Sequence, residues 1–223
     1  MPRQVKCYIA FAMEDTVRPP HRRTGRPLSF DRDAALEAAM HVFWRHGFEA
    51  TSVAELTKAM GITPPSLYAA YGDKQALFMA TIERYLGWLD AVTQTIAGAT
   101  SARSAARDLL TAAARGDSRD DAPPGCLLAS SIVSSSFGAD PLRATLADIR
   151  RNIEAALRER IEQDIHDQIL PPDTDADMIA GHIFAVVQGM STLAKDGATR
   201  DKLLRIADGA MAGWPRQEWN RPR

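Results

Sequence analysis

The chain has 223 residues, of which 45% are hydrophobic and 25% charged, and its formal net charge is −1. This balance is typical of a folded globular protein and excludes a uniformly basic protein that coats nucleic acid. No apolar run approaches the ~18–20 residues that a membrane-spanning helix needs. The only two cysteines are Cys7 and Cys126. We therefore expect a cytoplasmic protein that has no structural disulfide and no contact with a membrane.

Residues 1–28 are expected to form an irregular basic arm. They contain four prolines and show little periodicity, and the stretch from Arg18 to Arg26 holds four arginines and no acid. Arms of this kind can place an arginine in a DNA minor groove, and Arg26 is the candidate here. The alternative is a solvated basic tail that only aids solubility. Met13 is an alternative start site.

Residues 29–75 are expected to form a three-helix domain. Its first helix begins at Ser29 or Asp31 and ends at Gly47, with apolar residues recurring at helical spacing between them. The motif itself occupies residues 52–71. It contains an S-x-x-E capping box, a glycine that can end a helix and a proline pair in the first turn of the next helix: Ser52 and Glu55, Gly61, and Pro64 and Pro65 after the N-cap Thr63.

Two short helices joined by a glycine-containing turn describe a helix-turn-helix, whose second helix enters the DNA major groove. Helical hairpins that bind no DNA have the same pattern. The surface of the second helix carries no Arg, Asn or Gln for bidentate base contacts. Base discrimination is therefore expected from the hydroxyls of Thr63 and Ser66, from apolar contacts of Pro64, Pro65 and the alanines with thymine methyl groups, and from Arg26.

The remaining chain also reads as helical, which gives an all-α fold of about nine helices. A fourth helix is expected from Lys74 to about Ala97 and a fifth over 102–114. The later helices are expected at 126–136, from Asp140-Pro141 to Pro171, from a Thr174/Asp177 cap to Lys195, and from Arg200 to Pro215. Residues 76–215 would form an α-helical ligand-binding and dimerisation domain, and 216–223 a tail.

The stretch from Phe30 to Leu77 resembles the tetracycline-repressor (TetR) family of bacterial transcription regulators. The resemblance rests on FDRDAALEAAMHVFWRHGFEATSV, on GIT-x-x-SLY and on Y-G-D-K-x-A-L-F, and it covers about the first third of the chain. It implies that Thr51, Ser52, Tyr68 and Lys74 hold the DNA backbone. For Tyr68 and Lys74 the alternatives are core packing and an exposed charge, respectively.

The same resemblance implies a repressor that leaves a palindromic double-stranded DNA operator when a small molecule, not identified by the sequence, binds among the C-terminal helices. Candidates for the lining of that pocket are Cys126, Ile149, Met178, His182, Phe184 and Gln188. The last two helices would pair with those of a second subunit to form a homodimer. Candidates for that interface are Gly181, Ala185, Gly189, Leu203, Ala207, Ala210 and Met211. The alternative is that this stripe packs inside one subunit.

Two other functions compete with a DNA-binding regulator. One is a helical-bundle enzyme or ligand-binding protein that uses Cys126, His166 or His182, with Cys126 as the residue of a thiol-based enzyme. The other is a DNA-binding dimer with a role outside transcription. The sequence holds no nucleophile motif and no Gly-rich phosphate loop. Its five histidines and two cysteines lack the spacing of metal ligands. We therefore expect neither an enzyme, a metal site nor a cofactor.

Overall fold

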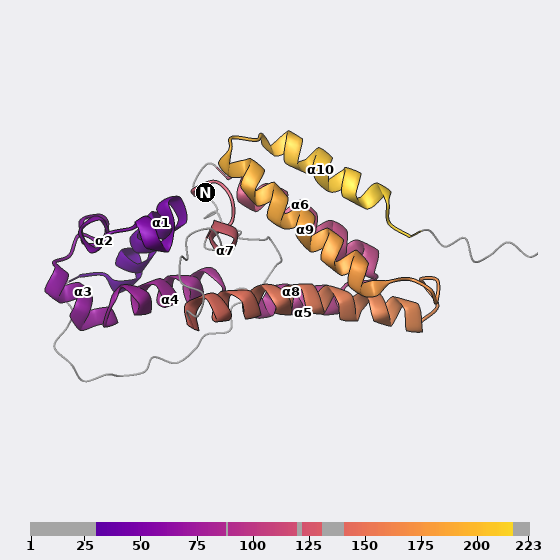
Figure 1. Ribbon diagram of the computed structural model, residues 1–223, viewed down its shortest axis with the longest axis horizontal. Helices are drawn as coiled ribbons and strands as arrows, with labels where there is room; N and C mark the ends of the chain where they lie inside the picture. Colours follow the sequence, from indigo (N-terminus) through magenta and orange to yellow (C-terminus); the bar gives the residue numbers. More distant parts are fainter. Residues whose placement is uncertain (1–29, 88, 120–121, 131–140, 216–223) are drawn as a thin grey trace, which may run out of the picture.

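The structure is a computed structural model that describes residues 30–87, 89–119, 122–130 and 141–215. Every regular element in these ranges is an α-helix, which confirms the all-α prediction. In chain order the helices are α1 (Arg32–Ala50), α2 (Val53–Met60), α3 (Pro64–Tyr71), α4 (Lys74–Tyr85), α5 (Leu89–Gly98), α6 (Ala102–Asp117), α7 (Leu127–Ser130), α8 (Pro141–His166), α9 (Ala176–Lys195) and α10 (Arg200–Ala212). Helices α1 to α4 lie at one end of the molecule, and α9 and α10 lie together at its other side (Figure 1).

The predicted fourth helix is two helices. Helix α4 ends at Tyr85, and α5 begins at Leu89. The last turn of α4 tightens, because the N–H of Gly87 donates to the carbonyl of Arg84 instead of continuing the i→i−4 pattern. A glycine inside a helix costs about 1 kcal/mol relative to alanine, so Gly87 is a favourable place for this break. The chain therefore has one helix more than expected within the described residues.

The local signals at helix ends in the N-terminal domain are confirmed. Ser52 and Glu55 form the complete capping box of α2, and the side chains of Asp31, Thr63 and Asp73 cap α1, α3 and α4. Gly61 ends α2 in the left-handed conformation at φ 66°. Gly47 also has a positive φ of 76°, but it makes a kink, after which the chain turns helically as far as Ala50.

Two details of the C-terminal prediction are wrong. The N-cap of α9 is Asp175, whose carboxylate accepts a hydrogen bond from the amide of Met178 at 2.9 Å, and not Thr174 with Asp177. Helix α8 ends at His166, before the Pro171-Pro172 pair, because Gln168 takes a positive φ of 60° that ends helical geometry. The predicted helix 126–136 is α7 as far as Ser130, and residues 131–136 lie outside the described part. The arm 1–28 and the tail 216–223 also lie outside it.

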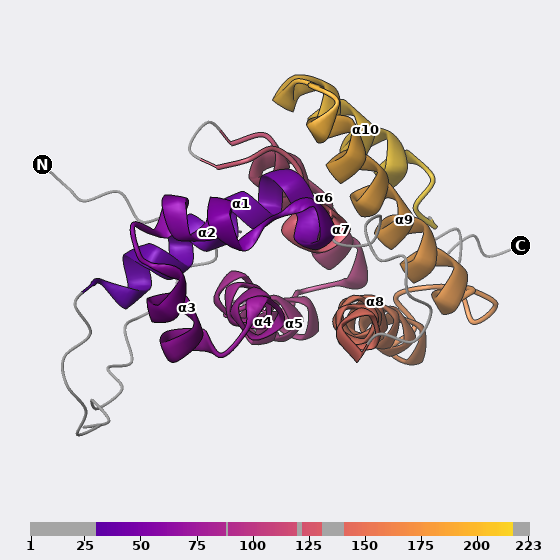
Figure 2. The ribbon, with the colours of Figure 1, turned by 60° about the vertical axis from the view of Figure 1, so that its left-hand side comes forward.

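The described helices share two apolar clusters. The first joins α1–α4 and includes Phe43, Leu67 and Phe78; the start of α8 and the leucines of α7 pack against it. The second joins α5, α6, α8, α9 and α10. Figure 2 shows α1 and α2 on one side of α4, with α8, α9 and α10 further along the molecule. Because α4 packs in the first cluster, its movement is tied to that of the helix-turn-helix.

The two halves meet at the Gly125–Cys126 junction, a segment that hydrogen bonds tie to four helices. The indole Nε1–H of Trp44 in α1 donates to the carbonyl of Gly125 at 2.8 Å, and the Tyr85 hydroxyl in α4 donates to Cys126 Sγ at 3.3 Å. The N–H of Gly125 donates to the carbonyl of Asp117 in α6 at 2.9 Å. The N–H of Cys126 donates to Ser191 Oγ in α9 at 2.6 Å.

Gly125→Ala should destabilise the protein by about 1–3 kcal/mol. Gly125 has a φ of +77°, and a Cβ there would lie 2.8 Å from both the Ser191 carbonyl oxygen and Lys195 Cγ. Gly197→Ala is the matched control, because Gly197 has a φ of +87° but nothing within 4 Å of the added carbon. Chemical denaturation of both variants separates the effect of the steric contact from that of the positive φ. Equal decreases in the free energy of unfolding would contradict the close approach at Gly125.

Candidate nucleic-acid interface and regulatory cavity

The surface of α3 is open to solvent. Its apolar side, Leu67 and Tyr71, is buried, whereas Thr63, Pro64, Pro65 and Ala69 are exposed and Ser66 is half-buried. The hydroxyls of Thr63 and Ser66 lie 2.9 Å apart, so they face the same side. The Tyr68 side chain is 50% exposed, which excludes the alternative that it is a core residue. The surface that the sequence assigned to base reading is therefore accessible.

Two predicted phosphate contacts, Ser52 and Lys74, lie at the starts of the helices before and after α3. Ser52 is exposed, and Lys74 begins α4 with its ammonium 4.5 Å from the centre of the Phe48 ring. The pKa of Glu55 is lowered chiefly by its hydrogen bonds with Ser52, and more weakly by the positive charges of His46 and Lys74. The charge of Lys74 therefore acts on the first turn of α2, where helix N–H groups also favour anions.

Thr51 and Arg26 do not join this surface in the described structure. The Thr51 side chain is 1% exposed, and its hydroxyl donates to the carbonyl of Gly47 at 2.6 Å. It therefore stabilises the kinked end of α1 and does not present its hydroxyl to a phosphate, contrary to prediction. Arg26 lies outside the described residues.

A cavity of about 90 Å³ lies where the two halves meet. Its wall is formed by α1, α4, α5, α6, α8, α9 and the segment around Cys126, and it is mostly apolar: Trp44, Tyr85, Val92, Leu109, Ala112, Ala113, Gly116, Asp117, Arg119, Cys126, Leu128, Arg150, Ile153, Phe184, Val187, Gln188 and Ser191. The Trp44 and Tyr85 rings meet edge to face with their centres 5.0 Å apart. Two helices of the helix-turn-helix half thus contribute directly to this cavity.

The structure brings together half of the predicted pocket. Cys126, Phe184 and Gln188 line the cavity. Ile149 does not; it packs against the apolar cluster of the N-terminal half. Met178 and His182 also do not, because they lie on the outer side of α9, where Met178 is 59% exposed. Their assignment to the cavity is wrong because helical periodicity alone does not tell which of two faces looks inward.

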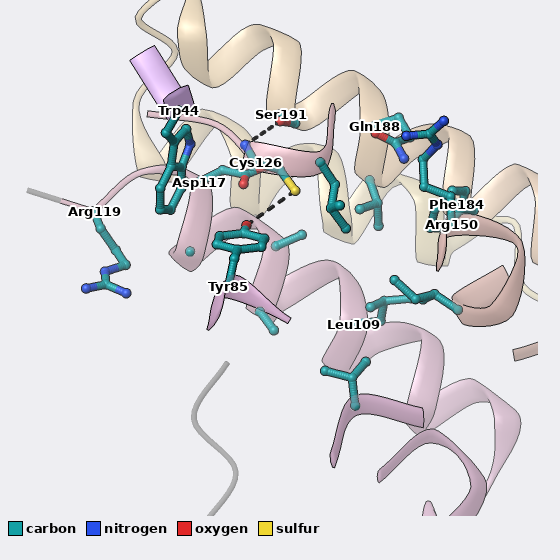
Figure 3. A pocket seen from close by; sticks show the side chains of 17 residues that line it. Trp44, Tyr85, Leu109, Asp117, Arg119, Cys126, Arg150, Phe184, Gln188 and Ser191 are labelled. Atoms are coloured by element: carbon teal, nitrogen blue, oxygen red, sulfur yellow. Dashed lines mark hydrogen bonds between the residues drawn. The ribbon is translucent and has the colours of Figure 1, made fainter. Parts of the chain in front are cut away.

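Two polar groups in the cavity wall lack hydrogen-bond partners among the residues that the structure describes. The side chain of Asp117 is only 5% exposed and its Oδ2 is unpaired, and Nη1 of Arg150 is also buried and unpaired. Burial raises the pKa of Asp117 to about 7, although the charge of Lys195 opposes the rise. Figure 3 shows Asp117 beside Cys126 and Tyr85 at one end of the cavity, and Arg150 beside Phe184 and Gln188 at the other.

Cys126 is placed unlike a catalytic thiol. Burial raises its pKa, the charge of Asp117 raises it further, and the Tyr85 hydrogen bond opposes these effects. A raised pKa leaves the weakly nucleophilic thiol as the main form at neutral pH. His166 and His182 are exposed and do not line the cavity.

Within the described ranges, no cluster of three His, Cys, Asp or Glu side chains could hold a metal ion. No helix among them is long and apolar enough to cross a membrane.

The predicted dimer residues fall into two groups. Leu203, Ala207 and Met211 are 0%, 4% and 3% exposed, because α10 packs this stripe against its own subunit. That part of the prediction is wrong, and the alternative of internal packing holds. Ala210 is half-buried, and Gly181 faces α8, since a Cβ there would lie 3.4 Å from Glu154 Oε1.

Ala185 and Gly189 belong to an exposed stripe along α9. With the other members, this outer stripe comprises Met178, His182, Ala185, Gly189 and Thr192, which recur at alternating steps of four and three residues. Such spacing keeps them on one side of the helix. The stripe contains no Lys, Arg, Asp or Glu, and small side chains at its centre permit close approach by another helix.

Four residues of the cavity wall could not be singled out from the sequence: Trp44, Tyr85, Asp117 and Arg150. Trp44 and Tyr85 look like ordinary apolar positions of amphipathic helices. Asp117 belongs to RGDSRDD, which reads as a polar loop, yet it is the last residue of α6 and is buried. No local signal distinguishes it from its exposed neighbours, because its burial depends on the approach of α9.

Asp117→Asn should stabilise the protein relative to the native chain as pH rises. The folded state holds the Asp117 proton up to about pH 7, whereas the ordinary pKa is near 3.8. Between these two pH values the folded state binds more protons than the unfolded state. The free energy of unfolding of the native chain, compared with that of the variant, therefore falls as pH rises and levels off above about pH 7. Over the whole range, this stability difference can change by at most ~4 kcal/mol, because about three pKa units count for ~1.4 kcal/mol each.

Denaturation across this pH range tests the prediction, with Asp108→Asn as control because Asp108 is exposed on the same helix. A native-minus-variant difference that stayed constant with pH would contradict the burial of an unpaired carboxyl.

Comparison with known proteins identifies the two halves. Residues 35–81 match the family model of bacterial regulatory proteins, tetR family, and residues 102–208 match the tetracyclin repressor-like C-terminal domain. The chain is 34% identical over 203 residues to the HTH-type transcriptional repressor ComR of Escherichia coli (strain K12), covering 90% of this chain and 97% of ComR. It is 33% identical over 199 residues to the repressor BdcR of the same strain, covering 86% and 92%.

A solved structure agrees with these relatives. It is a cysteine mutant of the TetR family transcriptional regulator CifR in complex with 26bp double-strand operator DNA. The chain superposes on it with a TM-score of 0.79 and 38% sequence identity, covering 85% of this chain and 100% of that one. The chain belongs to the TetR family of bacterial regulatory proteins and is a DNA-binding transcriptional regulator.

Proposed function

We propose that the protein is a homodimeric repressor that binds a palindromic operator and leaves it when a small molecule occupies the cavity between its two halves. The observation that carries this proposal is the composition of the cavity wall. Trp44 and Tyr85 come from the same apolar cluster as the exposed reading helix α3, and both line the cavity. The relatives ComR and BdcR are named repressors, and CifR binds double-strand operator DNA, which supports the assignment.

On the DNA, α3 would enter the major groove. Thr63 and Ser66 would offer hydroxyls to base edges, and Pro64 and Pro65 would offer apolar contact to thymine methyl groups. Ser52, Tyr68 and Lys74 would hold the backbone, with Arg26 in the minor groove. Because the reading surface is short of long polar side chains, phosphate contacts would supply a large share of the affinity.

The second subunit would pack on the outer stripe of α9. A twofold dimer presents two reading helices to two half-sites, which is why a palindromic operator is expected. Ala185 and Gly189 lie at the centre of this stripe and let a partner helix approach closely. Leu203, Ala207 and Met211 would support the interface from beneath, since they fix α10 on its own subunit.

Ligand binding would act through the Gly125–Cys126 junction. A molecule in the cavity touches Tyr85 and Cys126, whose hydrogen bond joins α4 to this junction. If the ligand binds better to an arrangement in which α4 is displaced, it shifts the population toward that arrangement and changes the spacing of the two reading helices. Differential affinity for the two arrangements is required for release.

No catalytic role is proposed. The Cys126 thiol has a raised pKa, and the exposed His166 and His182 lie away from the cavity that the thiol lines. A DNA-binding dimer with a role outside transcription would share the same surfaces, but the names of the relatives favour transcriptional repression. A cytoplasmic location stays a prediction.

Titrating the protein against its own upstream DNA at several salt concentrations tests operator binding. Lys74→Gln should weaken binding to every DNA sequence. It should also reduce the magnitude of the slope of log binding constant against log salt concentration by about 0.9 for each phosphate that is no longer neutralised, which is about 1.8 per dimer. Ser66→Ala should instead change the preference between operators. Lys202→Gln, on the exposed side of α10, is the control. Equal slopes for the native, Lys74→Gln and Lys202→Gln proteins would remove Lys74 from the interface.

Ala185→Arg should break the dimer by placing a long cation on the outer stripe of α9 in each subunit. Sedimentation velocity should then show monomers, with operator affinity reduced at least about tenfold because the two half-sites are no longer bound together. Ala144→Arg, at an exposed position of α8, should remain a dimer. A dimeric Ala185→Arg protein would place the interface elsewhere.

A further inference from the structure

The cavity has a definite chemical polarity, and this allows the class of its ligand to be named. Its volume of about 90 Å³ is roughly three times the ~30 Å³ that one water molecule occupies in the liquid, which suits a small organic molecule. The central wall is apolar, with Leu109, Ile153 and Val187 among its residues. Its two unpaired polar atoms, Asp117 Oδ2 and Arg150 Nη1, belong to the opposite ends seen in Figure 3.

We propose that the ligand is a short aliphatic or aromatic carboxylate that carries a hydroxyl group at its far end, with the carboxylate on Arg150 and the hydroxyl on Asp117. This assignment rests on the effector role proposed above and specifies the chemistry of the effector. An entirely apolar ligand would displace water from both polar groups and leave them unpaired, which costs affinity. A ligand with a polar group at each end satisfies both.

The carboxylate belongs at the Arg150 end because a guanidinium stays positively charged and only donates hydrogen bonds. Charge-assisted, often bidentate bonds make a carboxylate its best small partner. The arrangement of charge agrees. The Asp117 carboxyl lies at the opposite end of the cavity in Figure 3, so a ligand carboxylate placed on Arg150 is kept away from it.

The hydroxyl belongs at the Asp117 end for the complementary reason. A hydroxyl can donate to Asp117 when that carboxyl is ionised and can accept from it when it is protonated. A cationic amine would instead meet the positive charge of Lys195. The Tyr85 hydroxyl and the Cys126 thiol border the same end, so a ligand hydroxyl there lies next to the hydrogen bond that ties α4 to the Gly125–Cys126 junction.

Calorimetry on the full-length protein without DNA, at about pH 8, tests this assignment directly, since Asp117 is then mostly ionised. The probes are the ω-hydroxycarboxylates from 4-hydroxybutanoate to 8-hydroxyoctanoate, each compared with the unsubstituted carboxylate and the simple alcohol of equal length. At the chain length that fits, the hydroxycarboxylate should bind about tenfold or more tightly than either comparison compound. Equal affinities for all three compounds, or no binding of any hydroxycarboxylate, would overturn the assignment.

Two variants locate the two ends of the ligand. Asp117→Asn should reduce hydroxycarboxylate affinity about tenfold while leaving the affinity for the unsubstituted carboxylate nearly unchanged. Arg150→Met should weaken both carboxylates and leave the alcohol unaffected. The controls, Asp108→Asn and Arg143→Met, change exposed residues of the same helices and should bind as the native protein does. Unchanged affinities in Asp117→Asn and Arg150→Met would also overturn the assignment.

Operator release is measured separately, so that the two proposals can fail independently. A hydroxycarboxylate that binds with the expected selectivity but leaves the operator complex intact supports the ligand assignment and refutes the effector role. An operator complex that some other compound releases, while no hydroxycarboxylate binds, overturns the ligand assignment and leaves the effector role standing.

Discussion

The structure depends on the hydrogen bonds that converge on Gly125 and Cys126. Four helices that are distant in sequence, α1, α4, α6 and α9, each bond to this short segment. Two of these helices belong to the cluster that carries the reading helix, and the other two to the cluster of the regulatory half. Packed elements of this kind have discrete arrangements and do not deform continuously, so a change at the junction can be transmitted to the DNA surface. The helix residues that make these hydrogen bonds also line the cavity. A ligand in the cavity would therefore act directly on the segment that joins the two halves.

The unpaired polar atoms of the cavity affect both the stability of the protein and the chemistry of its ligand. Leaving Asp117 Oδ2 and Arg150 Nη1 without hydrogen-bond partners costs stability, since buried polar atoms are nearly always bonded. The same groups give the cavity a chemical preference, because a ligand that bonds both of them supplies the hydrogen bonds that the protein does not make itself. Gly125 serves the same region in a different way. Its positive φ, which glycine adopts without strain, and its close approach to α9 bring the amide of Cys126 within reach of Ser191.

Much of the fold could be predicted from the sequence because its signals are local. The Ser52–Glu55 capping box, the left-handed Gly61 and the proline start of α3 depend on residues within one turn of one another. The features that could not be predicted depend on which helix packs against which. Met178 and His182 show the same periodicity as core residues but face outward, whereas Leu203, Ala207 and Met211 pack inside their own subunit and not against a partner. Thr51 was expected to face DNA, yet the Gly47 kink turns its hydroxyl into the protein. Asp117 could not be recognised from the sequence, because its burial at the end of α6 depends on the segments that pack around it.

Hydrogen–deuterium exchange of the full-length protein, with and without operator DNA, tests the link most directly. We expect operator binding to change protection at the amides of Gly125 and Cys126, which donate to Asp117 and Ser191, as well as at α3. Peptides of α10, which contribute nothing to the junction, should change less. If exchange slowed only in α2, α3 and the start of α4, with no change at Gly125 and Cys126, the junction would not connect the DNA surface to the cavity.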